Sequence, residues 1–360
     1  MPDLISPLLG RPGAVDVTVL DGSAVPGVAA HYGDPMGEQR RLAGGAALVD
    51  LSNRGVITVT GPDRLSWLHS LTSQHLTGLA AGEGTETLIL SPKGHIEHAL
   101  HLVDDGSTVW ITVEPGTAPD VVGWLDSMRF MLRVEVADVT DRYAVLATTG
   151  GSADPGAADL QVPEVARWVD PWPAVEDGRL ADGTAAYGPV EGHPGLDWSL
   201  TEVIVDRDAL VALAAREDLS WAGTAALEAL RIAAWRPRLG AETDHRTIAH
   251  EVDWLRTAVH LQKGCYRGQE TIARVHNLGR PPRRLVFLHL DGSGHALPAP
   301  GAPVRLGEKV IGRVTSVAQH HEEGPIALAV VKRNVDAGAD LLVGEDESVV
   351  SAAQTVIVTP

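Results

Sequence analysis

Cysteine is almost absent from this chain of 360 residues, which has a single one, Cys265. One thiol cannot form a disulfide within the chain, so the fold does not depend on disulfide bonds. Long hydrophobic runs are missing too, and we therefore expect no transmembrane helix. The first nine residues lack a basic leader and a sustained apolar core, which argues against a signal peptide. Together these absences predict a cytoplasmic protein.

Positive charge is also scarce. The chain has 29 Lys and Arg against 47 Asp and Glu, a formal net charge of −18. Such a charge argues against indiscriminate binding to membranes or nucleic acids, so we expect no membrane association and no direct DNA binding. Residues 263–284 are the exception, with six Lys or Arg and one acid. This basic segment fits an anionic ligand, such as a carboxylate, a phosphate or a short RNA, or else a solvated surface that balances nearby acids.

The single cysteine lies in a dense motif, Lys263-Gly264-Cys265-Tyr266-Arg267-Gly268-Gln269-Glu270. Free cysteines are often buried and inert, and that is the simpler interpretation. The flanking cations, Lys263 and Arg267, instead favour a thiolate and hence a reactive Cys265. A helix predicted from Gln269, with Glu270 in its first turn, would favour the thiolate further. The two glycines allow a positive φ or a close approach of a ligand.

Apolar patterns predict both strands and helices. Runs rich in β-branched residues predict strands at residues 56–60, 87–90, 95–103, 109–113, 134–136 and 143–148, with a turn at 91–94. Helical spacing predicts helices at residues 65–71, 121–128, 209–215 and 224–235. Residues 150–156 form a Gly-rich connection, and we expect residues 163–194 to be irregular.

The chain after residue 284 changes character. Short β runs separated by Gly and Pro lie at residues 285–290, 304–306, 310–317, 326–331 and 355–358, a pattern typical of a small β-barrel. We therefore predict an α+β fold with three regions. They are an N-terminal α+β region at 1–150, a second α+β unit at 151–283 that ends in the cysteine motif, and a barrel at 284–360, with interleaving of the first two left open.

The cysteine motif resembles the K-G-C-Y-x-G-Q-E signature of the YgfZ-type proteins, which belong to the superfamily of the glycine-cleavage T-protein. T-proteins are tetrahydrofolate-dependent aminomethyltransferases with a similar segment that lacks the cysteine. Weaker similarities to the superfamily lie at residues 48–52, 61–63, 71–72, 89–94, 230–232 and 238–242. The resemblance implies two related, ferredoxin-like α+β units and a C-terminal barrel around a central opening that binds folate.

The resemblance also implies a function. YgfZ-type proteins bind tetrahydrofolate, or a one-carbon derivative of it, and support the maturation or repair of iron–sulfur enzymes. The implied partners are those enzymes or their assembly factors, including a client enzyme that modifies tRNA by thiolation. Two alternatives remain open: a folate-dependent aminomethyltransferase, and a non-catalytic scaffold that docks an RNA or a protein.

Two departures from the T-protein pattern count against aminomethyl transfer and leave open whether the chain is an enzyme. Ala233 stands where T-proteins have a Glu that binds the pterin. His98 and Ala99 stand where they have an acidic pair. Other carboxylates could replace the missing Glu, and the nearest in sequence are Glu228, Glu242 and Asp244.

We predict catalytic roles for Cys265 and Lys263. The predicted folate-binding residues are Arg231, Trp235, Arg236, Tyr266, Gly268, Gln269, Glu270, Arg274 and His98. Arginine pairs with carboxylates, and tryptophan stacks on flat rings, although both also occur at ordinary helix surfaces and in cores. On a strand, a spacing of three places His98 on the face opposite His95 and His101. The three side chains cannot then converge on one ion, so we expect no metal site.

Overall fold

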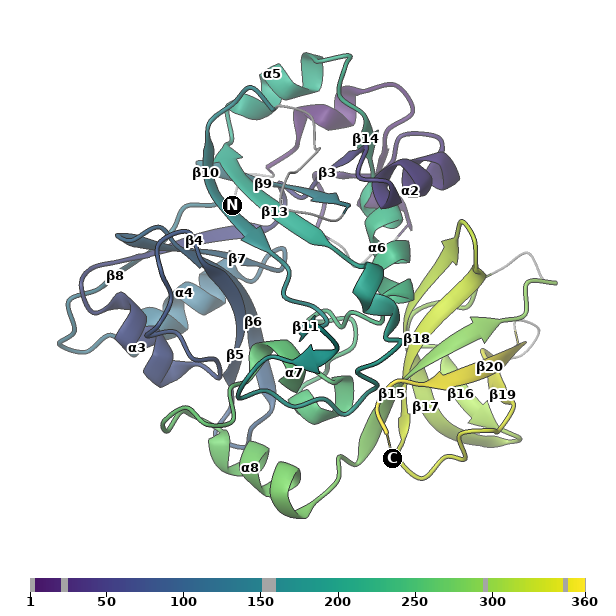
Figure 1. The fold of residues 1–360 in the computed structure, drawn as a ribbon. Coiled ribbons are helices and arrows are strands. Elements are labelled where there is room, and N and C mark those ends of the chain that lie inside the picture. Colours follow the sequence, from purple (N-terminus) through teal and green to yellow (C-terminus); the bar gives the residue numbers. More distant parts are fainter. Residues whose placement is uncertain (1–3, 21–24, 151–159, 294–296, 346–348, 360) are drawn as a thin grey trace. The chain divides into compact units, whose positions relative to one another are not determined.

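The computed structural model describes residues 4–20, 25–150, 160–293, 297–345 and 349–359. These residues form an α+β fold with a C-terminal barrel, which confirms the predicted fold class (Figure 1). The chain divides into two units built from separate segments. Met1–Leu88, His98–Pro171 and Trp198–Leu227 form the first unit, and Ile89–Glu97, Trp172–Asp197 and Glu228–Pro360 form the second. The predicted connection after Gly150 lies outside the described residues, and the boundaries at 150 and 283 stay predictions.

The first unit contains a five-stranded antiparallel sheet. Its strands, in spatial order, are β5 (Gly84–Leu90), β6 (Ile96–Asp104), β7 (Thr108–Val113), β4 (Gly55–Thr60) and β8 (Glu135–Asp138). The β-branched run of β4 suits a central strand, and Val56, Ile57 and Val59 are fully buried. The predicted helices are present here as α3 (Arg64–Leu71) and α4 (Ala118–Ser127).

A second five-stranded sheet completes the first unit. Its order is β10 (Glu164–Val169), β13 (Leu200–Asp206), β9 (Tyr143–Thr149), β3 (Leu48–Asp50) and β14 (Trp221–Ala222). The prediction that residues 163–194 are irregular is wrong for β10, which has alternating burial with Ala166 and Trp168 buried, and which pairs with β13. The other elements of this unit are η1 (Pro7–Gly10), β1 (Val15–Asp16), α1 (Val17–Leu20), β2 (Ala29–His31), α2 (Pro35–Ala43) and α5 (Ala209–Ala215).

The tip of the β5–β6 hairpin belongs to the second unit. The predicted turn at residues 91–94 is present: Ser91 N donates to His95 O at 2.8 Å, and Gly94 has a φ of 76°. Beyond the turn, Ile96 N donates to Thr247 O at 2.9 Å. The hairpin tip is therefore attached by backbone hydrogen bonding to the unit that contains the cysteine motif.

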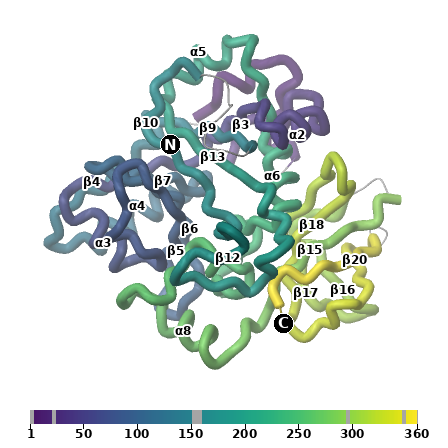
Figure 2. The backbone as a smooth tube through the Cα atoms, viewed as in Figure 1, coloured from purple at the N-terminus to yellow at the C-terminus, as the bar shows by residue number. Residues whose placement is uncertain are grey.

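The C-terminal part of the second unit is a closed six-stranded barrel, in green to yellow in Figure 2. Its strands, in order, are β15 (Arg283–Leu290), β18 (Gly324–Lys332), β17 (Lys309–His320), β16 (Pro303–Leu306), β19 (Leu341–Val343) and β20 (Val350–Val356). Buried side chains such as Val286, Leu288 and Val314 fill its core. The predicted barrel is confirmed, although β19 was missed because it has only three residues.

Short elements make up the rest of the second unit. They are β11 (Val175–Glu176), β12 (Arg179–Leu180), η2 (Pro194–Asp197), most of α6 (Thr224–Ala233), η3 (Ala249–Val252), α7 (Leu255–Ala258) and α8 (Gln269–Leu278). Helix α6 ends two residues before the predicted limit, and Trp235 has a left-handed φ of 57°. None of the helices in the described part of the chain has the length and apolarity needed to cross a bilayer.

Candidate functional site

The cysteine motif forms a tight turn that leads into α8. Gln269 N donates to Tyr266 O at 3.3 Å and closes the turn. Gly268, at the third position, has φ 82° and ψ −2°, the conformation that a type II turn requires there. Helix α8 begins at Gln269 as predicted, and Cys265 directly precedes the turn.

The tip of the β5–β6 hairpin packs against this turn through backbone contacts. A Cβ atom added at Gly268 would lie 2.6 Å from Ser91 O, and one added at Gly94 would lie 2.6 Å from Thr271 Cβ. Both contacts are closer than any real Cβ allows, so both positions require glycine. The hairpin tip and the motif therefore form one site, although they are far apart in the sequence.

Cys265 is exposed at the surface. The neighbouring Gly264 is exposed as well, and a Cβ atom added there would meet nothing within 4 Å. This placement removes the alternative of a cysteine buried in the core. The thiol is accessible to a ligand or a partner, as a chemical role requires.

Lys263 and Tyr266, which flank Cys265 in the motif, are buried. They are only 6% and 8% exposed, and the Lys263 ammonium lies 5.0 Å from the centre of the Tyr266 ring. Burial lowers the pKa of Lys263 to about 8 and raises the pKa of the Tyr266 hydroxyl. A minority of the Lys263 side chains are therefore uncharged near neutral pH, and these can accept a proton.

The burial of Lys263 predicts a pH dependence of stability. Between its folded pKa of about 8 and its ordinary value of 10.5, the unfolded chain holds a proton that the folded protein has lost. We therefore expect the free energy of unfolding to rise with pH across this window. Urea unfolding at a series of pH values should show a smaller rise for Lys263→Met. The exposed Lys93→Met is the matched control, and an equal rise in all three proteins would contradict the assignment.

Some cations of the basic segment at residues 263–284 pair with acids of the chain or are buried, and others are exposed. Arg283 pairs with Asp244 at 2.6 Å and with Glu251 at 2.8 Å, while Arg284 is fully buried. Arg267 lies 3.4 Å from Glu97 on the hairpin. These cations therefore balance nearby acids, which is one of the two roles expected for the segment.

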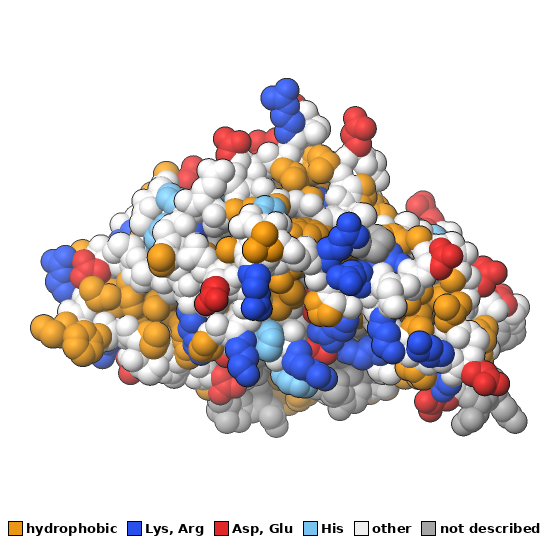
Figure 3. Space-filling view, turned by 90° about the horizontal axis from the view of Figure 1, so that it is seen from below, with side chains coloured by type: hydrophobic (Ala, Val, Ile, Leu, Met, Phe, Trp, Pro, Cys, Tyr) orange, Lys and Arg blue, Asp and Glu red, His pale blue; other side chains and the backbone are white. Residues whose placement is uncertain are grey.

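The remaining cations of the segment are exposed on α8 or just after it. Arg274 is exposed on α8, Arg280 is exposed two residues after the helix ends, and Lys93 is exposed on the hairpin tip. Lys and Arg side chains, with His beside them, gather on the face seen in Figure 3. This surface can attract an anion.

Arg231, a predicted folate-binding residue, lies in a buried ion-pair network of the second unit. Its guanidinium donates to Glu228 at 2.9 Å, to Glu242 at 3.0 Å and to the Ser316 hydroxyl at 2.7 Å. Glu242 is fully buried, and Arg231 is only 4% exposed. The arginine therefore connects α6 to strand β17 of the barrel.

The three acids considered as substitutes for the missing pterin Glu each bind an arginine of the chain. Glu228 and Glu242 both pair with Arg231, and Asp244 pairs with Arg283. Desolvation opposes the ionised form of Glu228, but its arginine partners outweigh it and lower the pKa of this carboxyl to about 2. These carboxylates are thus occupied by internal ion pairs.

Trp235 and Arg236 lie together in an aromatic group. Trp235 is half-buried, and Arg236 is 4% exposed with its guanidinium 5.4 Å from the centre of the Trp172 ring. The rings of Trp172 and Trp235 flank His193, a residue that sequence reasoning missed. The only local signal was a histidine before Pro and Gly in a segment expected to be irregular.

The remaining predicted residues lie on two elements. Gln269, Glu270 and Arg274 are on α8, and His98 is half-buried on β6 in the first unit. His101 stacks flat on Trp168, with ring centres 3.8 Å apart, so it packs within the first unit. Within the described ranges, no group of three His, Cys, Asp or Glu is placed to hold a metal ion.

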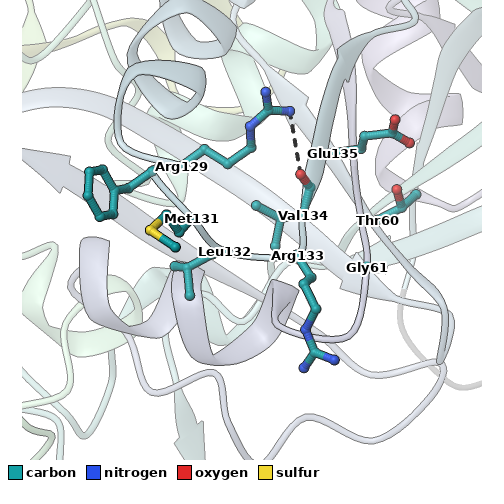
Figure 4. Close-up of a pocket in the computed structure, with 9 residues that line it drawn as sticks. Thr60, Gly61, Arg129, Met131, Leu132, Arg133, Val134 and Glu135 are labelled. Carbon is teal, nitrogen blue, oxygen red and sulfur yellow. Dashed lines mark hydrogen bonds between the residues drawn. The ribbon is translucent and has the colours of Figure 1, made fainter.

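A surface hollow in the first unit is a different feature. It is lined by Thr60, Gly61 and residues 129–135 (Figure 4). Arg129 donates to Val134 O at 3.5 Å, and Arg133 pairs with Asp63 at 2.7 Å. Because its arginines are already bonded within the unit, we place no ligand in this hollow.

Comparison with known proteins matches two parts of the chain to domains of the glycine cleavage T-protein. Residues 35–163 match the GCVT N-terminal domain, and residues 283–357 match the glycine cleavage T-protein C-terminal barrel domain. The structure resembles the glycine cleavage system aminomethyltransferase T of Bartonella henselae, with a TM-score of 0.75 and 18% identity, over 98% of this chain and 95% of that one. This similarity shows a shared fold.

Sequence relatives agree with the domain matches. A chloroplast protein of Arabidopsis thaliana that is named a transferase is 27% identical over 317 residues, covering 84% of this chain and 69% of that protein. An aminomethyltransferase of Streptomyces avermitilis is 28% identical over 318 residues, covering 84% of this chain and 82% of the enzyme.

Proposed function

We propose, on the premise that this chain belongs to the glycine cleavage T-protein superfamily, that it binds tetrahydrofolate or a one-carbon derivative and serves iron–sulfur enzymes through a reactive thiol. The observation that carries the proposal is the exposed Cys265 just before the turn that leads into α8, two residues after the buried Lys263. The motif K-G-C-Y-x-G-Q-E, in which this cysteine stands, supports a YgfZ-type accessory role.

The residues present fit a flat, anionic ligand such as folate. Trp235 offers a half-buried aromatic ring, and the exposed Arg274 on α8 and Arg280 just after it can attract carboxylates. Nε2 of His193 is among several buried polar atoms of the second unit that have no hydrogen-bond partner in the described part of the chain. Tetrahydrofolate, when bound, would supply the capacity to carry a one-carbon unit.

The chemistry of the chain's own residues centres on Cys265. Uncharged Lys263 accepts the thiol proton, and Arg267 adds positive charge that favours the thiolate. The thiolate then acts as a nucleophile, as a carrier of an oxidised sulfur or as a transient ligand of iron. Gly268 and the hairpin tip hold the motif in place through the contacts described above.

The proposed clients are iron–sulfur enzymes or their assembly factors, including an enzyme that thiolates tRNA, and the proposed compartment is the cytoplasm. We expect Cys265→Ala to abolish complementation of a strain whose tRNA thiolation depends on this protein. The readout is thiolated tRNA in cells. Gly264→Ala, an exposed change in the same motif with open space around it, is the matched control and should complement fully. Full complementation by Cys265→Ala would exclude the thiol mechanism.

Calorimetric titration of the purified protein with tetrahydrofolate tests the binding half of the proposal. Binding by the wild type and by Cys265→Ala alike is expected, because the exposed thiol is not needed for the fold. Salt-sensitive binding of RNA without any affinity for folate would instead support a docking scaffold, which the exposed cations on and just after α8 favour.

Aminomethyl transfer is the second candidate activity, favoured by the similarity to aminomethyltransferases. His98 and Ala99 cannot supply the fixed negative charge of an acidic pair. Release of ammonia from an aminomethyl carrier in a tetrahydrofolate-dependent reaction would establish this activity.

A further inference from the structure

The loop that follows α4 in the first unit exposes four large apolar side chains, and we call residues 128–132 the apolar loop. Phe130 is 91% exposed and Met131 is 83% exposed, and Met128 and Leu132 are exposed as well. The other phenylalanine of the chain, Phe287, is buried. Single apolar residues at a surface are ordinary, but four within five positions indicate a contact surface.

The apolar loop is held in place at both ends. Met128 O accepts a hydrogen bond of 3.2 Å from Trp67 Nε1, and Arg133 N donates to Asp63 Oδ2 at 2.9 Å. Between these points, Phe130 has a left-handed φ of 47°, a conformation that is strained for a bulky residue. The loop therefore presents the Phe130 ring in a fixed conformation, and a group fixed in advance loses little entropy when it binds.

The apolar loop leads directly into an open edge of the first sheet. Strand β8 is the last strand of that sheet, and in the described part of the chain it pairs with β4 alone. Val139 N, just beyond β8, donates to Val56 O at 2.9 Å. Because the residues of an antiparallel strand face its partner alternately, Val136 and Asp138 turn their backbone N–H and C=O groups to the open edge.

The loop and the strand edge form one continuous surface. The hollow drawn in Figure 4 is lined by residues of the apolar loop and by Glu135, the first residue of β8. An extended segment paired with β8 would therefore place every second side chain on the side of this hollow and of Phe130. Apolar side chains suit those positions, because they remove the exposed rings and thioethers from water.

Charge distinguishes the molecules that could cover this surface. An anionic membrane and a second copy of the chain would each meet a formal net charge of −18, which repels them. An open strand edge instead binds an extended peptide through main-chain hydrogen bonds, which do not depend on net charge. The surface thus fits a segment of a different protein.

We propose that the apolar loop and the open edge of β8 dock an extended segment of a partner protein, with apolar side chains at alternate positions. This inference rests on the proposed function and assigns the surface to the iron–sulfur client. Phe130 and Met131 bury against the client, and Val136 and Asp138 pair with its backbone. Cys265 belongs to the second unit, so docking and thiol chemistry can be tested separately.

The docking surface is tested by calorimetry with the full-length protein and the purified iron–sulfur enzyme that thiolates tRNA in the complemented strain. We expect Phe130→Ser to weaken binding about tenfold or more, because it removes the most exposed ring. Val136→Pro removes one N–H of the open edge, which an edge strand tolerates, and should also weaken binding. Val211→Ser, an exposed apolar change on α5, is the matched control and should bind within about twofold of the wild type.

A cellular readout separates docking from the thiol. Phe130→Ser should fail to restore thiolated tRNA, although it binds tetrahydrofolate and its Cys265 reacts with a thiol reagent as in the wild type. Wild-type affinity for the enzyme in a folded Phe130→Ser, or no binding by the wild type itself, would overturn the docking surface and leave the proposed function intact.

Two other results would assign the surface to a different occupant and overturn the proposal as well. One is a wild-type dimer in sedimentation velocity that Phe130→Ser abolishes, and the other is binding to vesicles of anionic phospholipid that the same change abolishes. Loss of both folate binding and Cys265-dependent complementation would overturn the proposed function, and with it the assignment of the client.

Discussion

Replacement of Arg54 by Met is expected to lower the free energy of unfolding by about 3–5 kcal/mol, because it leaves a buried charge without its partner. That charge is Glu202, which is fully buried between the two sheets of the first unit. Glu202 pairs with Arg54 and accepts hydrogen bonds from the Thr112 hydroxyl at 2.5 Å and from His101 Nδ1 at 3.1 Å. Two hydrogen bonds cannot replace the positive charge of the arginine. The midpoint of urea unfolding, followed by tryptophan fluorescence, measures the loss.

Two further variants test this explanation. Arg133→Met removes an exposed arginine that pairs with Asp63, and we expect a change below about 1 kcal/mol. Adding Glu202→Gln to Arg54→Met removes the buried charge and should recover much of the lost stability. An equal loss of unfolding free energy in Arg54→Met and Arg133→Met would show that the buried pair stabilises the protein no more than an exposed one.

The same pair predicts the response of the wild type to acid. Desolvation opposes the ionised form of Glu202, but Arg54 and His101 outweigh it and hold the pKa of this carboxyl at about 2, below its ordinary 4.5. Its stabilisation is therefore fully present above pH 4.5 and is lost as the pH falls toward 2. The free energy of unfolding of Arg54→Met should depend less on pH between about 2 and 4.5 than that of the wild type.

Gly268→Ala should both destabilise the second unit and inactivate the cysteine motif. An alanine at the φ of 82° costs about 1–2 kcal/mol, and its Cβ would lie 2.6 Å from Ser91 O, which adds about 1–3 kcal/mol of strain. The hairpin tip and the motif must then separate. We expect thermal unfolding at a lower temperature and failed complementation, as for Cys265→Ala.

Gly264→Ala is the control for this change, since it adds the same methyl group four residues earlier in open space. Its stability should stay within about 0.5 kcal/mol of the wild type. Equal stability and equal activity of the two alanine variants would show that the backbone contact with Ser91 does not position the motif.

Local patterns allowed much of the fold to be predicted. The spacing of apolar residues located α5 at its observed bounds, and short β runs after residue 284 indicated the barrel. Strands β10 and β13 were missed because they are stabilised by pairing with each other across a segment rich in Trp, Pro and Gly. Pairing between distant segments leaves little local signal.

The site also has a local part that the sequence reveals and contacts between distant residues that it does not. The cysteine motif is contiguous, so its turn and helix could be predicted from the sequence. The contact of Gly94 with Thr271, and the partners of Arg231 on the barrel, join residues far apart in the chain. Whether Nε2 of His193 finds a hydrogen-bond partner depends on which atoms surround it, and no sequence pattern reports that.

The exposure of Cys265 has a consequence for its oxidation. Peroxides oxidise a solvent-exposed cysteine to a sulfenic acid. Many redox proteins resolve this species with a second cysteine of their own, but this chain has none. Recovery of the thiol must then come from another molecule, such as glutathione or the thiol of a bound client, so the redox state of Cys265 is set by its surroundings.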